Sequence, residues 1–130
     1  MKIKLTKIYV NDQEKALRFY TDVLGFQKKD DFSNEGYRWL TVVSPEEPDG
    51  AQLQLELNSF PAAKAFQEAL YEAGQPAAVL QSDDVQADYD RMTALGATFT
   101  MPPTDVTFAV TATVDDTCGN LLQLTQLARW

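Results

Sequence analysis

One sequence pattern occurs twice in the chain, and this repeat constrains the fold more than any other feature. Residues 8–26 read IYVNDQEKALRFYTDVLGF, and residues 79–97 read VLQSDDVQADYDRMTALGA. In each stretch a short apolar run leads to an acidic residue, then to an apolar stripe at helical spacing, and then to a glycine. Asp and Asn are preferred at helix N-caps, and glycine commonly follows the last helical turn. A strand followed by a helix is therefore predicted twice. Asn11 or Asp12 caps the first helix, and Asp83 or Asp84 caps the second.

Segments typical of strands follow each predicted helix. Residues 37–43 are rich in β-branched and aromatic types, and residues 51–58 alternate leucine with polar residues. These two segments predict a hairpin with a long loop. In the second half, strands are predicted at 106–114 and 121–127, on either side of a turn. Each half therefore consists of a strand, a helix and further strands that end in a hairpin.

Residues 59–74 predict a helix that connects the two halves, with Pro61 near its start and Gly74 at its end. Each half has one helix to cover its sheet, so the other sheet face must bury itself, line a cavity or meet another sheet. Along residues 51–58 the face opposite the leucines is wholly polar, as expected where a ligand or water lies. That face carries Gln52, Gln54, Glu56 and Asn58.

The charge and the residue counts exclude several classes of function. The formal charge is −8, from 19 acidic and 11 basic residues, and the basic residues form no cluster. Binding to nucleic acid or to an anionic membrane is therefore not expected, because both need a basic surface. One cysteine allows no intrachain disulfide, and the absence of histidine excludes catalytic triads and metal sites that need it. No apolar run predicts a membrane span or a signal peptide, so a cytoplasmic protein is expected.

Together these motifs resemble the vicinal-oxygen-chelate superfamily, the group of glyoxalases, bleomycin-resistance proteins and extradiol dioxygenases. The resemblance covers nearly the whole chain. It is carried by Val10-Asn11-Asp12, EKALRFYTDVLGF, LQLEL, DDVQADYDRMTALGA and DDTCGNLLQLTQL. It implies an α+β fold of two βαβββ modules whose sheets curl into a cup, and it implies a homodimer. The expected organisation is one domain over 1–130, with module one at 1–58, the connecting helix at 59–74 and module two at 75–130.

The resemblance also indicates where a metal would bind. Enzymes of the group hold one divalent ion with ligands from the first strand and the last hairpin strand of each module. Carried over to this chain, those positions are Leu5, Ala77, Gln123 and either Gln54 or Glu56. A hard divalent ion takes about six oxygen ligands, and leucine and alanine supply none. No metal and no cofactor are therefore expected, and the metal-dependent reactions are not transferred to this chain.

Six residues are predicted to line a ligand site. Glu56 could anchor a cationic group or act as a general base, or it could form an ion pair with Lys7 or Arg38. Lys7 would hold an anionic or hydroxylated ligand, or else belong to a solvated edge strand. Trp39 would stack on a planar ligand or pack in the core. The full set is Glu56, Gln54, Gln123, Lys7, Tyr9 and Trp39.

Other residues are weaker candidates for the ligand site. Tyr37 and Arg38 flank Trp39, and Thr111 and Thr113 share one face of a predicted strand. Cys118 is interpreted as an incidental turn residue, because the two acidic residues before it disfavour a reactive thiolate.

Three functions follow from these residues. The first is metal-free binding or sequestration of a small organic molecule in the cup. The alternative is a lyase, isomerase or dioxygenase-type enzyme of the same superfamily without the usual metal centre. The third is a structural or regulatory partner protein.

Overall fold

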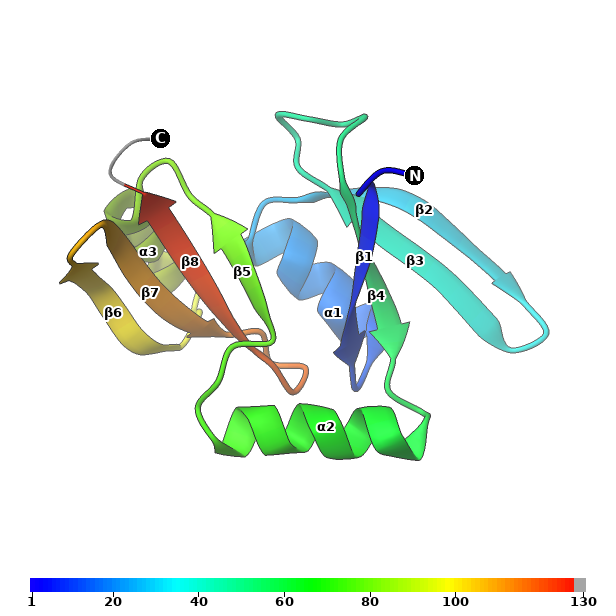
Figure 1. Ribbon diagram of the computed structural model, residues 1–130. Helices are drawn as coiled ribbons and strands as arrows, with labels where there is room; N and C mark the ends of the chain where they lie inside the picture. The colour runs from blue at the N-terminus through cyan, green and yellow to red at the C-terminus, as the bar shows by residue number, and fades with distance from the viewer. Residues whose placement is uncertain (128–130) are drawn as a thin grey trace. The chain divides into compact units, whose positions relative to one another are not determined.

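The computed structural model describes residues 1–127 (Figure 1). The chain divides into two compact units, Met1–Phe66 and a second unit that begins at Gln67. The first unit contains β1 (Leu5–Val10), α1 (Gln13–Arg18), the π-helical turn η1 (Phe19–Val23), β2 (Gln27–Asn34), β3 (Tyr37–Val43) and β4 (Gln52–Leu57). Helix α2 (Pro61–Glu72) crosses the boundary between the units. The second unit continues with β5 (Ala78–Gln81), α3 (Val85–Ala94), β6 (Phe99–Val106), β7 (Ala109–Asp115) and β8 (Leu121–Leu127).

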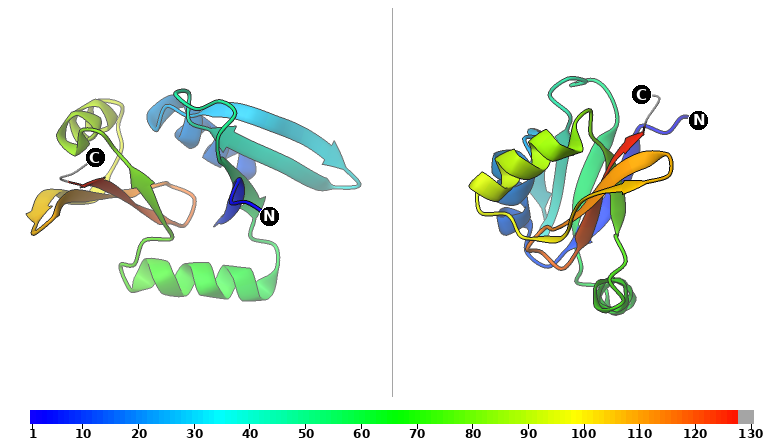
Figure 2. Two further views of the ribbon diagram at one scale, coloured as in Figure 1. Left: turned by 45° about the horizontal axis from the view of Figure 1, so that its top comes forward. Right: turned by 90° about the vertical axis from the view of Figure 1, so that its left-hand side faces the viewer.

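Each unit holds one four-stranded sheet, and the two sheets have the same topology. The strand orders are β1-β4-β3-β2 and β5-β8-β7-β6. The first strand of each unit pairs in parallel with the last, and the remaining neighbours are antiparallel. Figure 2 shows both sheets from two further sides. The predicted fold class, α+β with the βαβββ order written twice, is confirmed.

The start of each repeated helix is fixed by an acidic side chain, as predicted. Asp12 accepts a hydrogen bond from the Lys15 amide at 3.0 Å, and Asp84 accepts one from the Ala87 amide at 3.0 Å. Of the two candidate caps in the second half, Asp84 is therefore the cap. Both residues have extended backbone, as N-caps usually do.

The structure corrects one predicted strand and adds two, β2 and β6. The segment 106–114 is not one strand, because β6 ends at Val106 and β7 begins only at Ala109. Strand β6 contains Pro102 and Pro103, which cannot donate to a ladder, and it lies at the sheet edge with two register shifts. Strand β2 was not predicted, since its sequence QKKDDFSN lacks apolar alternation. It too is an edge strand.

The core of each unit lies between its sheet and its repeated helix. In the first unit, alternate residues of β1, β3 and β4 face α1 and η1 and are almost fully buried together with Tyr20 of η1; the strand residues include Ile8, Val10, Leu40, Val42 and Leu55. In the second unit the corresponding set includes Val85, Met92, Ala112, Val114, Leu122 and Leu124. Because each helix covers one face of its sheet, the other face of each sheet holds the polar residues. Within residues 1–127, no helix combines the length and the hydropathy that a bilayer crossing requires.

The turn between β7 and β8 is organised by a buried acidic residue, Asp116. Its Oδ1 accepts hydrogen bonds from the backbone amides of Cys118 at 2.7 Å and Asn120 at 3.0 Å, and its Oδ2 accepts one from Asn120 Nδ2 at 2.7 Å. Asp116 and Cys118 are both fully buried. Cys118 therefore lies in the predicted turn, but it is packed inside the protein and not at the surface.

Helix α2 is bound to this same turn. Gln67 Nε2 donates to the Cys118 carbonyl at 3.0 Å and to Asn120 Oδ1 at 3.2 Å. One helical turn later, the Tyr71 hydroxyl donates to Asp115 Oδ2 at 2.5 Å. The hydrogen bond to the Asp115 carboxylate raises the pKa of Tyr71 above its usual value, so this phenol stays protonated as the donor at neutral pH. The second half of α2 is thereby fixed to the β7–β8 turn.

Candidate ligand site

Most of the predicted site residues lie on one face of the first sheet, opposite α1. Strand alternation places Lys7 and Tyr9 of β1 on this face. The parallel register sets Lys7 opposite Gln54 and Tyr9 opposite Glu56. From β3, Tyr37 and Trp39 project to the same face, because Arg38 between them contacts α1. The predictions that Lys7 shares a face with Tyr9, and Gln54 with Glu56, are therefore correct.

Three of these side chains form a closed hydrogen-bonded triangle. The Tyr37 hydroxyl donates to Glu56 Oε2 at 3.0 Å. Gln54 Nε2 donates to the same carboxylate oxygen at 2.8 Å and to the Tyr37 hydroxyl oxygen at 3.0 Å. Gln54 is only 6% exposed while Tyr37 is 46% exposed, so the triangle reaches from the sheet out to the solvent. We call it the Tyr37–Gln54–Glu56 triangle.

The triangle fixes the position of the Glu56 carboxylate and the protonation state of Tyr37. Burial, together with the hydrogen bond to the Glu56 carboxylate, raises the pKa of the Tyr37 phenol above its ordinary value of 10.0. At neutral pH the phenol is therefore protonated and donates to Glu56. The sequence left open whether Gln54 or Glu56 faces the site, and the structure places both there in direct contact.

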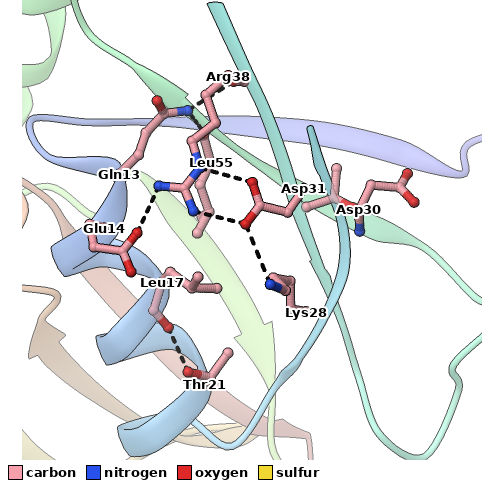
Figure 3. A network of polar contacts seen from close by, with 10 residues as sticks. Gln13, Glu14, Leu17, Thr21, Lys28, Asp30, Asp31, Arg38 and Leu55 are labelled. Carbon is pink, nitrogen blue, oxygen red and sulfur yellow. Dashed lines mark hydrogen bonds and ion pairs between the residues drawn. The ribbon is translucent and has the colours of Figure 1, made fainter. Parts of the chain in front are cut away.

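Neither of the ion pairs considered for Glu56 is present. The guanidinium of Arg38 lies on the opposite sheet face, where it donates to both oxygens of Asp31 at 2.9 Å and to Glu14 Oε2 at 2.9 Å (Figure 3). The ammonium of Lys7 lies 5.3 Å from the centre of the Tyr9 ring and makes no ion pair within residues 1–127. The weaker prediction that Arg38 belongs to the ligand site is wrong, since it ties β2 and β3 to α1.

The contacts of Arg38 with Asp31 and Glu14, which we call the Arg38 network, make the stability of the first unit sensitive to acid. Hydrogen bonds from Arg38, with a further contribution from Lys28, hold the pKa of Asp31 below its ordinary value of 3.8. A carboxylate with a lowered folded-state pKa stabilises the fold above its unfolded pKa, and this stabilisation is lost as the pH falls through the folded-state pKa.

We therefore expect the melting temperature of the protein to fall on acidification below about pH 4, and to fall less steeply in Asp31→Asn. Thermal unfolding followed by circular dichroism over a pH series measures this difference. Asp22→Asn, which removes an exposed carboxylate of the same unit, serves as the control and should keep the wild-type slope. Equal slopes for wild type and Asp31→Asn would contradict the assignment.

Aromatic rings extend the site beside the triangle. Trp39 stacks on Phe32 of the neighbouring strand, with ring centres 6.4 Å apart and planes inclined by 22°. The Trp39 indole N–H donates to Asp30 Oδ2 at 3.4 Å. Phe32 is 62% exposed, so the stack is open to solvent and is not part of the core.

Two residues of this site were missed or undervalued from the sequence. Phe32 was missed because β2 was not predicted. Tyr37 was given a minor role, although the alternation of YRWLTVV already places it on the face of Trp39. The set that we call the first-sheet site comprises Lys7, Tyr9, Phe32, Tyr37, Trp39, Gln54 and Glu56.

Gln123 lies in the second unit, on a sheet face without charged side chains at its centre. Its Nε2 donates to Thr125 Oγ1 at 3.0 Å. The register places Gln123 opposite Thr113 and Val79, and Thr125 opposite Thr111. Thr111 and Thr113 therefore share a strand face, as predicted, and the register places Gln123 on that face as well. This face offers hydroxyl and amide groups but no carboxylate next to Gln123.

Comparison with known proteins settles the family. The family model for the Glyoxalase/Bleomycin resistance protein/Dioxygenase superfamily matches residues 2–124. The chain belongs to this superfamily. It is 47% identical over 126 residues to the protein YurT of Bacillus subtilis (strain 168), covering 97% of this chain and 99% of that one.

Two solved structures with the superfamily fold match almost the whole chain. UcmS2 matches 96% of this chain and 97% of its own length, with a TM-score of 0.84 and 28% identity. TnmS3, an antibiotic binding protein from Streptomyces sp. CB03234, matches 98% of this chain and 97% of its own, with a TM-score of 0.78 and 27% identity.

Two of the four metal positions that the resemblance implies have side chains without donor atoms. Leu5, opposite Gln52, and Ala77, beside Leu121, have aliphatic side chains without donor atoms. The Gln54 amide nitrogen is already bonded to Tyr37 and Glu56. Among residues 1–127, no three His, Cys, Asp or Glu side chains come together in a way that could hold an ion. The residues present therefore do not fit the divalent metal of the superfamily's enzymes.

Proposed function

We propose that this protein binds a small organic molecule at the first-sheet site without a metal. The observation that carries the proposal is the Tyr37–Gln54–Glu56 triangle beside the exposed Phe32–Trp39 stack. A flat aromatic surface next to a few oriented polar groups is the usual composition of a small-molecule site. In such a site the aromatic rings provide contact area for the ligand, and the carboxylate fixes the orientation of the ligand.

The relatives support binding in preference to catalysis. TnmS3 is an antibiotic binding protein, and it shares the fold over almost the whole of this chain. The catalytic alternatives in the superfamily rest on a metal whose ligand positions hold Leu5 and Ala77 in this chain. The proposal retains two sequence-based predictions, a homodimer and a cytoplasmic location.

A screen for ligands followed by one substitution tests the proposal. Aromatic compounds that raise the melting temperature are titrated against ¹⁵N-labelled protein, and we expect the shift changes to centre on β2, β3 and β4. Trp39→Ala should weaken these ligands at least about tenfold, because truncation of a central aromatic anchor commonly removes 2 kcal/mol or more, as a rough guide.

Phe108→Ala provides the matched control. Phe108 is 68% exposed and lies in the turn between β6 and β7 of the second unit, so its removal deletes an exposed ring outside the first-sheet site. This variant should bind like the wild type. Ligands whose affinity is unchanged in Trp39→Ala and whose shift changes map to the second unit would overturn the proposed site.

A further inference from the structure

The hydrogen bonds at the centre of the first-sheet site engage the donors of Tyr37, Trp39 and Gln54. Gln54 Nε2 gives its two hydrogens to Tyr37 and Glu56, and the Tyr37 hydroxyl gives its hydrogen to Glu56. The Trp39 indole N–H is directed to Asp30. The three donors nearest the aromatic stack are therefore already engaged within the protein, and a ligand that needs donors finds none at these positions.

Acceptor capacity remains at the same place. Both bonds to Glu56 end on Oε2, and Oε1 receives no hydrogen bond and no ion pair within residues 1–127. A carboxylate can accept about four hydrogen bonds over its two oxygens. Because the triangle holds Oε2, the carboxylate plane is fixed and Oε1 stays available at the surface of the sheet.

Within residues 1–127 no basic side chain forms an ion pair with the Glu56 carboxylate, so a cationic ligand can reach it. Arg38 is on the opposite face, engaged by Asp31 and Glu14. Lys7 lies over the Tyr9 ring and is not paired with Glu56. An ammonium group is attracted both to a carboxylate and to the face of an indole or phenol ring. The formal charge of −8 attracts cations to the protein as a whole.

We infer that the first-sheet site selects aromatic ligands that carry a hydrogen-bond-donating ammonium group, with the ring against Trp39 and the N–H groups directed to Glu56 Oε1. This inference rests on the proposed function and gives it a ligand class. Glu56 determines the specificity of the site, and the hydrogen bonds from Tyr37 and Gln54 orient it for that purpose.

Three indole probes with one ring system test the ligand class on the full chain. Tryptamine offers a cation with N–H donors, its N,N,N-trimethyl derivative offers a cation without them, and indole-3-propionate offers an anion. Titrations followed by ¹⁵N shift changes give the three dissociation constants. We expect tryptamine to bind at least about tenfold more tightly than indole-3-propionate, as a charge-assisted hydrogen bond implies, with the trimethyl derivative between them.

Substitution of the carboxylate tests its role. Glu56→Gln keeps the side-chain shape and should abolish the preference for tryptamine over indole-3-propionate. Glu46→Gln, which removes the same charge from an exposed loop position of the same unit, should preserve it. Tyr37→Phe keeps the Glu56 charge, so it should retain a preference for the cation, and it serves as a second variant if Glu56→Gln folds poorly.

The outcomes separate this inference from the proposed function. Equal or tighter binding of indole-3-propionate, or a preference that survives in Glu56→Gln, overturns the inference. So does equal binding of tryptamine and its trimethyl derivative, because the N–H donors would then be irrelevant. If probes of every charge bind equally and lose affinity in Trp39→Ala, the inference fails while the proposed site stands. If no indole probe binds and the ligand screen gives no hit, both fail.

Discussion

Asp116→Ala should lower the free energy of unfolding by about 3 kcal/mol or more. The substitution removes the acceptor of three hydrogen bonds, two from backbone amides and one from the Asn120 side chain, in a position that solvent does not reach. Each buried donor left without a partner costs about 1–3 kcal/mol. Urea unfolding of the purified variant, followed by circular dichroism, measures the loss.

Two further variants make this prediction specific to the turn. Asp116→Asn retains a side-chain oxygen for the two backbone amides and should lose less than the alanine variant. Asp83→Ala removes an exposed carboxylate at the start of the second repeated helix and should remain close to the wild type. A loss below 1 kcal/mol for Asp116→Ala, with an unchanged denaturant slope, would refute the structural role assigned to the turn.

Gly119→Ala should destabilise the protein by about 2–4 kcal/mol. Gly119 has a φ of +99°, a conformation in which residues with a side chain cost about 1–3 kcal/mol. A Cβ there would also lie 2.7 Å from Gln67 Nε2. Gln67 must then give up hydrogen bonds to Cys118 and Asn120, at about 1 kcal/mol each. The same urea titration measures the combined effect.

A matched glycine separates the two causes. Gly96 has a similar φ of +92°, but a Cβ there would meet no atom within 4 Å, so Gly96→Ala reports the backbone strain alone. We expect Gly119→Ala to be the more destabilising of the two. In Gln67→Ala the clash is already absent, so Gly119→Ala should cost less in that background than in the wild type. Equal losses of unfolding free energy in Gly119→Ala and Gly96→Ala would show that the contact with Gln67 of α2 adds nothing to the backbone strain.

Much of the fold could be predicted from local signals. Asp12 and Asp84 mark helix starts because a short acidic side chain can accept from the exposed amides of the first turn. The strands at Tyr37–Val43 and Leu121–Leu127 have the predicted bounds, because both lie inside their sheets and are rich in buried apolar residues.

Two of the edge strands, β2 and β6, could not be predicted in the same way. Residues 27–34 and 99–106 are held by backbone pairing on one side only, and much of each strand is exposed. An exposed edge strand does not need the alternating pattern by which a half-buried strand is recognised, and β6 even tolerates two prolines.

The sequence predicts which residues of β4 share a sheet face but not how their side chains are connected. Alternation alone places Gln54 and Glu56 on one face, and the structure has them there in direct contact. The sequence does not determine which side chain contacts Glu56, because it does not show on which sheet face each charged side chain lies. Arg38 immediately precedes Trp39 in the chain, and one residue in a strand is enough to turn a side chain to the opposite face.

The carboxylates of Asp116 and Glu56 contribute differently to the stability of the protein. Asp116 is buried and holds backbone amides, so its loss removes part of the structure itself. Glu56 is partly exposed, and its partners are the side chains of Tyr37 and Gln54. Loss of both Tyr37 and Glu56 would leave the Gln54 amide nitrogen without these two partners, at a cost of about 1–3 kcal/mol. A library randomised at Tyr37, Trp39, Gln54 and Glu56 together can replace these hydrogen bonds and should yield folded proteins that prefer different ligands, which makes the first sheet a starting point for engineered binders.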